Sequence, residues 1–171
     1  AVQVEILDST PWDSSIDLSN HVAEVELSEL ANGSSRVGIS TKGIVASVRE
    51  DCGIIMRCTQ CRRVLKDGIC AQHGSDSGNQ DIRLRLVIDD GKATSSLLTN
   101  KDATLELLGI GEKDIVSEID SNGQMEFVQS LRNKLLGKQV MASGRAIVDD
   151  QGTMILADKT ELIDIDPAML A

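Results

Sequence analysis

The positions of apolar residues along the chain predict mainly β-strands. Apolar and β-branched residues dominate residues 37–48, and Gly38 and Gly43 inside this run suit a strand that bulges or bends. Apolar residues then occupy every second position from 82 to 88, and an Asp-Asp-Gly turn leads into a returning strand at 93–98. These segments predict one long strand followed by a hairpin.

Two helices are predicted after this hairpin. The first begins after Asn100, a good N-cap, and stops at Gly109. The second ends at Gly137. Its predicted buried face consists of Met125, Val128, Leu131 and Leu135.

A last hairpin is predicted around residues 149–152, another Asp-Asp turn that contains a glycine. The element order is therefore a strand, an insert, a hairpin, helices and a second hairpin. This order predicts a β-rich barrel of five strands, with the helices between the third and the fourth.

The ends of the chain differ from this central region. Residues 1–33 are acidic and rich in turn formers, so we expect an incoming segment or linker with one strand at 2–7. Residues 21–30 fit a further strand or a helical turn equally well. We expect the barrel domain at 34–165 and a short tail at 166–171.

Charge is unevenly distributed over the chain. The formal net charge is −10, which taken alone argues against a non-specific polyanion binder. Residues 36–101, however, contain 11 Lys/Arg against 7 Asp/Glu, so the middle is basic and the ends are acidic. No apolar run approaches the roughly 18 residues of a membrane span. We expect a cytoplasmic, nucleoid-associated protein without a membrane partner or a small-molecule substrate.

A cluster of cysteine and histidine residues lies in the insert, within the sequence CTQCRRVLKDGICAQH. Cys58 and Cys61 form one x2 pair, and Cys70 and His73 form a second pair after eight residues. Such pairs supply two ligands each from a tight turn, and three thiolates with one imidazole suit tetrahedral Zn²⁺. Because all four positions are protein ligands, the predicted zinc is structural and not catalytic.

Disulfides and chance free thiols are the alternatives to this metal site. A disulfide framework is unexpected in a chain without extracellular features, and chance thiols would seldom form two x2 pairs. We expect the zinc ribbon to span residues 52–74. Cys52 is interpreted as an ordinary buried or strand-end thiol, and His21 as a surface residue.

The segment GIIMRCTQCRRVLKDGICAQHG, followed by DIRLRLVIDDGKAT, resembles the zinc-containing OB domain of archaeal replication protein A, a single-stranded DNA-binding protein. The resemblance covers roughly residues 26–163 and includes SSRVGISTKGIVASV as the first strand. It implies an OB-fold, a five-stranded Greek-key barrel with the zinc ribbon between strands 1 and 2. It also implies Cys58, Cys61, Cys70 and His73 as the ligands.

Basic residues crowd the ribbon and the following hairpin, where a groove that follows a nucleic-acid backbone needs cations. The alternative is that these charges only solvate a β surface. The candidate phosphate-binding residues are Arg57, Arg62, Arg63, Lys66, Arg83, Arg85, Lys92 and Lys42.

Aromatic residues for base stacking are scarce. The chain has only Trp12 in the expected linker and Phe127 on a helix face that should be buried. Stacking contributes roughly 1–3 kcal/mol per base in single-strand binders. We therefore expect weak binding by this domain alone and tethering to other OB domains or subunits.

The main functional hypothesis is sequence-tolerant single-stranded DNA binding in replication, repair and recombination. One alternative is an assembly module of the same kind of complex, acting through the acidic ends or the helix at 124–136. Another is a zinc-ribbon accessory module of an acyl-transfer enzyme, although there the ribbon precedes the barrel. We expect no enzyme, because no nucleophile–base pair is present and the Asp pairs at 89–90 and 149–150 fit turns.

Overall fold

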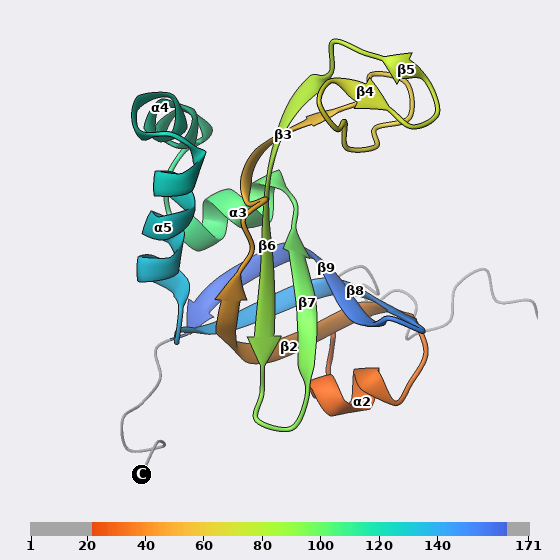
Figure 1. Cartoon of the computed structure of the whole chain (residues 1–171). Coiled ribbons are helices and arrows are strands. Elements are labelled where there is room, and N and C mark those ends of the chain that lie inside the picture. Colours follow the sequence, from red (N-terminus) through yellow and green to blue (C-terminus); the bar gives the residue numbers. More distant parts are fainter. Residues whose placement is uncertain (1–21, 164–171) are drawn as a thin grey trace, which may run out of the picture.

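The computed structural model describes residues 22–163 (Figure 1). Most of the fold is β structure, as the hydrophobic pattern predicts. The strands are β1 (Ala23–Glu24), β2 (Arg36–Val48), β3 (Gly53–Arg57), β4 (Ile69–Cys70), β5 (Gly74–Ser75), β6 (Asn79–Asp89), β7 (Thr94–Thr99), β8 (Gln139–Asp149) and β9 (Gly152–Ile163). The helices are α2 (Leu27–Ala31), α3 (Lys101–Leu108), α4 (Glu112–Asn122) and α5 (Gln124–Leu135). None of these helices is long and apolar enough to cross a membrane.

Five strands pair in a closed ring around the core. The strand order β2-β8-β9-β7-β6 is closed by a further pairing between β2 and β6. β7 and β9 are parallel, and the other pairs of the ring are antiparallel. The buried residues of β6 alternate along the strand, as its sequence pattern predicts, and Leu84, Leu86 and Ile88 are fully buried. The ring therefore encloses an aliphatic core.

Two glycines allow β2 to take part in this ring. Gly38 has a φ of +64°, and the pairing register with β8 shifts between Arg36 and Ile39. A Cβ at Gly43 would lie 2.9 Å from the Cβ of Ile88, so a side chain here would push β2 away from β6. Gly38 therefore marks a bulge, as predicted, whereas Gly43 marks a close approach of β2 to β6.

Three helices lie between β7 and β8, where the sequence indicated two. The α3 helix has the predicted ends: Asn100 accepts a hydrogen bond from the backbone N–H of Ala103 at 2.8 Å, and Gly109 adopts a left-handed conformation. The α4 helix was not predicted. Its hydrophobic signal is weak, because Ile115 is its only fully buried residue.

The predicted buried face of α5 needs one correction. Val128, Leu131 and Leu135 are buried, but Met125 is 69% exposed. Phe127 takes the core position in the first turn instead, because its ring packs against Gly53 at the start of β3. Figure 1 shows α4 and α5 beside the barrel, on the side of β2 and β3.

Part of the expected incoming segment packs on the barrel. For residues 21–30 a strand and a helical turn were the two alternatives, and the described residues of this segment contain both. β1 pairs in parallel with β2, and the short helix α2 follows it. Leu27 and Leu30 are fully buried in the main core. The carboxylate of Asp90, in the β6–β7 turn, accepts a hydrogen bond from the N–H of Leu27 at 3.0 Å. The strand predicted at 2–7, Trp12, His21 and the tail at 166–171 lie outside the described residues.

Candidate nucleic-acid interface and metal centre

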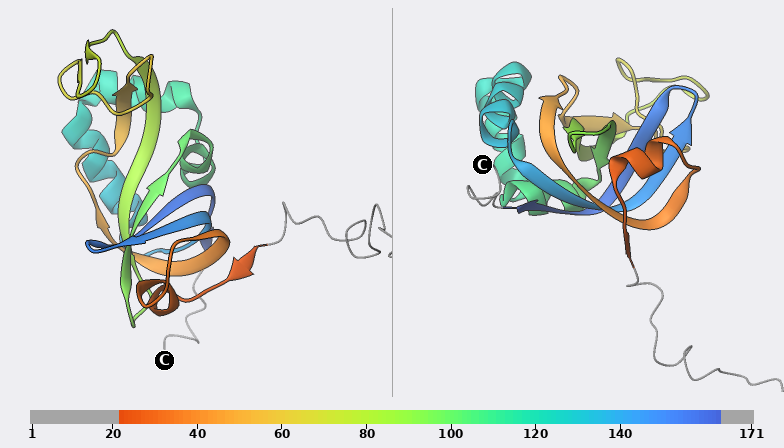
Figure 2. Two further views of the ribbon diagram at one scale, coloured as in Figure 1. Left: turned by 90° about the vertical axis from the view of Figure 1, so that its right-hand side faces the viewer. Right: turned by 90° about the horizontal axis from the view of Figure 1, so that it is seen from below.

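The ribbon projects from the barrel at the ends of β3 and β6 (Figures 1 and 2). β3 pairs with the first half of β6, and the chain between them folds into the small β4–β5 sheet. Its buried residues, Cys58, Leu65 and Cys70, form a cluster separate from the main core. This cluster is too small to stabilise some twenty residues by burial alone, so the ribbon needs another source of stability.

The four predicted ligands meet in this cluster. Their ligand atoms all lie within 4.8 Å of one another. The Sγ atoms of Cys61 and Cys70 are 3.5 Å apart, and Nδ1 of His73 lies 3.6 Å from Sγ of Cys58 and 3.7 Å from Sγ of Cys70. Zn–S and Zn–N bonds of ordinary length place tetrahedral ligands about 3.5–3.8 Å apart. The arrangement therefore fits one tetrahedral metal ion.

Local hydrogen bonds prepare this cluster for a cation. The backbone N–H of Gln72 lies 3.4 Å from Sγ of Cys70, and such N–H groups lower the pKa of this thiol to about 6. The lowered pKa favours the thiolate form of Cys70, which is the form that binds metals.

Asp76 is a positioning residue of the ribbon that the cysteine spacing did not reveal. Its carboxylate accepts hydrogen bonds from the N–H of Gly78 at 2.7 Å and from the hydroxyl of Thr59 at 2.8 Å. These bonds, that of Gly78 above all, lower the pKa of Asp76. The carboxylate thereby ties the end of the ribbon to the first ligand pair.

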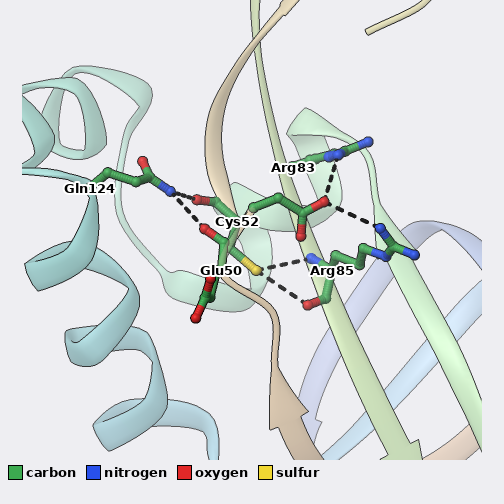
Figure 3. Close-up of polar contacts among 6 residues, drawn as sticks. Glu50, Cys52, Arg83, Arg85 and Gln124 are labelled. Carbon is green, nitrogen blue, oxygen red and sulfur yellow. Dashed lines mark hydrogen bonds and ion pairs between the residues drawn. The ribbon is translucent and has the colours of Figure 1, made fainter. Parts of the chain in front are cut away.

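Cys52 lies apart from the metal cluster, as expected for a buried thiol. Its Sγ accepts a hydrogen bond from the N–H of Arg85 at 3.1 Å and donates one to the carbonyl of Arg85 at 3.3 Å (Figure 3). Burial raises the pKa of this thiol. Cys52 therefore stays protonated and joins the start of β3 to β6.

A surface groove of about 700 Å³ crosses β7, β8 and β9. Its floor includes the half-buried side chains of Leu98 and Leu156. Four cationic side chains and one carboxylate line it, and these are Arg57, Arg83, Arg145, Lys159 and Asp158. The groove therefore combines an apolar floor with an excess of positive charge, in a chain of net charge −10.

The structure brings only two of the predicted phosphate-binding residues into this groove. Arg57 lines it and forms an ion pair with Asp81 at 2.5 Å, which lowers the pKa of Asp81 against the opposing effect of burial. Arg83 also lines it. Arg145 and Lys159 were not among the predicted residues; both are exposed and form no ion pair with another described residue. Both lie on strands of the predicted last hairpin, but only the position of β9 between β7 and β8 brings them to the groove.

Arg83 and Arg85 are less free than their outward strand positions suggested. The carboxylate of Asp51 accepts from Arg83 at 2.9 Å and from Arg85 at 3.3 Å. The side chain of Arg83 is only 14% exposed. Figure 3 draws the side chains of Arg83 and Arg85 in contact with the same carboxylate. Asp51 therefore competes with any incoming anion for these two cations.

The remaining predicted cations lie elsewhere. Arg62, Arg63 and Lys66 are exposed on the ribbon. Lys92 pairs with Glu26 at 3.2 Å and Lys42 with Glu24 at 3.3 Å. Figure 1 places the β6–β7 turn, which holds Lys92, at the opposite end of the barrel from the ribbon. These two lysines therefore do not extend the groove.

The apolar lining of the groove is aliphatic. No aromatic side chain within residues 22–163 lines the groove, because Phe127 is 1% exposed in the core. Val37 is 83% exposed at the rim, beside Leu98 and Leu156 on the floor. The groove therefore offers apolar contact to a base but no stacking plane from an aromatic ring.

No family model matches the chain, and no curated protein matches it significantly. Solved structures do resemble it. A replication protein A heterotrimer bound to ssDNA matches with a TM-score of 0.58 and 12% identity, over 88% of this chain and 38% of that chain. Yeast RPA bound to ssDNA matches with a TM-score of 0.51 and 18% identity, over 84% of this chain and 90% of that one. At these identities the likeness shows a shared fold, that of the OB domains of replication protein A.

Proposed function

We propose that this chain is a zinc-containing OB-fold module that binds single-stranded DNA with little sequence preference. The observation that carries the proposal is the cation-lined groove across β7, β8 and β9. In this interpretation, the closed ring of strands is the five-stranded Greek-key barrel of the OB-fold, and the ribbon is inserted between its first and second strands.

The chemistry of the groove suits a nucleic-acid strand. Arg145 and Lys159 are free to contact phosphates, since neither is held by a carboxylate of the described chain. Bases would lie against Leu98 and Leu156, and such contacts carry no sequence information. Without aromatic stacking, phosphate contacts supply a larger share of the affinity, so binding should be weak and strongly salt-dependent.

In this proposal, Zn²⁺ is structural. The thiolates of Cys58, Cys61 and Cys70 and Nδ1 of His73 would hold it, and no coordination position would remain for a water or substrate. The ion supplies folding energy to a ribbon with almost no core of its own. The ribbon then holds Arg62, Arg63 and Lys66 beside the end of the groove that contains Arg57.

We further propose a non-enzymatic role within a complex like replication protein A, of the archaeal type, in replication, repair and recombination. Partners would be single-stranded DNA and other OB-domain subunits, in the cytoplasm at the nucleoid. An assembly role is the second candidate, and the 69% exposed Met125 on α5 favours it. The acyl-transfer accessory module is disfavoured, because the ribbon follows β2 instead of preceding the barrel.

The groove can be tested with a double variant, Arg145→Gln with Lys159→Gln. Both side chains are exposed, so the fold should survive the change. Salt-titrated fluorescence anisotropy with an oligo-dT should show weaker binding. The slope of log K against log salt should also fall by about 0.7 for each lost phosphate contact.

Lys113→Gln, alone and together with Lys138→Gln, is the control for one and two lost charges, because both lysines are exposed and lie outside the groove. These variants change net charge without removing a groove contact. Wild-type protein that retains zinc but does not bind oligo-dT at low salt would overturn the proposed function in favour of assembly. Equal effects of the double variant and the control would show that the groove is not the binding site.

A further inference from the structure

A second arginine-lined pocket lies where α5 meets the loop between β2 and β3. Its volume is about 400 Å³, and Arg49, Arg85 and Arg132 line it together with Glu50 and Asp51. None of its residues lines the groove across β7, β8 and β9. The pocket is therefore a separate concave site, with three cationic side chains against two acidic ones.

These guanidinium groups have unused hydrogen-bonding capacity. Arg49 is exposed and forms no ion pair within residues 22–163. Nε of Arg85 is buried and has no hydrogen-bond partner in the described part of the chain. Arg132 donates to the carbonyl of Val48 at 3.2 Å, which holds its side chain at the pocket. Guanidinium groups that are held in place and keep N–H donors without partners suit an oxyanion, above all a phosphate.

The pocket is built on a loop that α5 holds in place. The side-chain amide of Gln124 donates to the carbonyl of Glu50 at 3.3 Å and also to that of Cys52 (Figure 3). Cys52 in turn bonds both backbone groups of Arg85. The loop and β6 are thus joined before any ligand arrives, which reduces the entropy lost on binding.

The pocket and the groove are neighbours through β6. Arg83 lines the groove and Arg85 lines the pocket, and two positions along a strand correspond to about 6.6 Å. The carboxylate of Asp51 bridges the two arginines. An anionic chain that lies in the groove therefore meets the second group of cations as soon as it crosses β6.

We propose that this pocket binds a phosphate of the same DNA strand, next to the phosphates held in the groove. The inference rests on the proposed function, because it extends the path of the strand from the groove across β6 to α5. A phosphodiester fits better than an acidic protein segment, because the pocket continues a groove whose apolar floor suits bases.

The test compares Arg49→Gln with Arg145→Gln over a series of oligo-dT lengths. Arg145→Gln, in the groove, should weaken binding at every length. Arg49→Gln should match the Lys113→Gln control for short oligonucleotides. Above a threshold length, it should weaken binding several-fold and lower the salt slope by about 0.7. Thermal melting should show that all three variants fold.

Three results would overturn the inference while the proposed function stands. The first is binding by Arg49→Gln equal to that of the control at every length, which would leave the pocket without a phosphate. The second is a loss of binding to short oligonucleotides as large as that of Arg145→Gln, which would make the pocket part of the groove. The third is equal competition by polyglutamate of matched charge for the Arg49-dependent binding, which would assign the pocket to an acidic protein. If the wild type bound no oligonucleotide at all, the proposed function itself would fail.

Discussion

At the scale of single residues, Asp51 restrains two cations of the basic surface. Arg83 and Arg85 both donate to its carboxylate, and these two arginines belong to the groove and to the second pocket respectively. Nε of each arginine is buried without a partner among residues 22–163. The carboxylate thus accepts hydrogen bonds from two partly buried cations and lowers the positive charge that a phosphate would meet.

Removing this carboxylate should change affinity and stability in opposite directions. In Asp51→Asn, Arg83 and Arg85 are released, so we expect oligo-dT to bind several-fold more tightly at low salt. The melting temperature should fall, because the poorly exposed Arg83 loses its charged partner. Anisotropy and thermal melting measure the two effects.

Glu50→Gln is the control for this variant. It removes the same charge from the neighbouring residue, which lines the second pocket but forms no ion pair with any residue of 22–163. Its gain in affinity should be smaller and its melting temperature unchanged. If Asp51→Asn bound DNA no better than Glu50→Gln, the carboxylate would not restrain the two arginines.

At the scale of elements, the ribbon and the barrel differ in how much buried core stabilises each of them. The barrel has a continuous core, whereas the ribbon has only the cluster of Cys58, Leu65 and Cys70. β3 belongs to the barrel side of this boundary, because it pairs with β6 and its Gly53 packs against Phe127. The metal-dependent part should therefore begin after β3, later than the boundary at residue 52 expected from the sequence.

Zinc removal should unfold the ribbon and leave the barrel intact. Structural zinc in finger peptides contributes roughly 10–16 kcal/mol, far more than this small cluster can. After treatment with a strong chelator, hydrogen exchange should lose protection at residues 58–78 and keep it in β8 and β9. Cys61→Ser should reproduce this pattern, and Cys52→Ser, outside the cluster, should not. Loss of protection throughout the ring would contradict the division into two units.

At the scale of the whole molecule, the net charge and the local charge of the groove have opposite signs. The net charge of −10 repels DNA at long range, whereas the groove and the second pocket present local positive charge. The groove also lacks aromatic side chains from the described residues. The negative net charge and the lack of aromatic side chains both favour weak DNA binding by one module. Tethering to further DNA-binding modules would then raise the overall affinity.

A tandem fusion of two copies through a flexible linker tests this expectation. On an oligonucleotide long enough for both copies, the fusion should bind about 10²–10⁴ times more tightly than one copy, because the second contact is intramolecular. A fusion in which one copy carries Arg145→Gln and Lys159→Gln should lose most of this gain. A fusion no tighter than a single copy would argue against tethered DNA binding.

The cluster of three cysteines and one histidine and the main strands were predictable because their signals are local. Two x2 pairs bring ligands together within single turns, and the alternation along β6 assigns a face to each residue without reference to the rest of the chain. Asn100 and Gly109 cap the two ends of α3, and their signals are equally local. Such features need only neighbouring residues to form, so the sequence pattern was enough to predict them.

The binding surface depended on contacts between distant segments. Asp51 reaches Arg83 and Arg85 across 32 and 34 positions, so no local pattern shows that these cations are paired. Arg145 and Lys159 enter the groove only because β9 lies between β7 and β8. The burial of Leu27 and Leu30 likewise requires the closed ring beneath α2. Local spacing determined the Cys/His cluster, whereas the long-range pairing of strands decided which cationic side chains remain without a carboxylate partner.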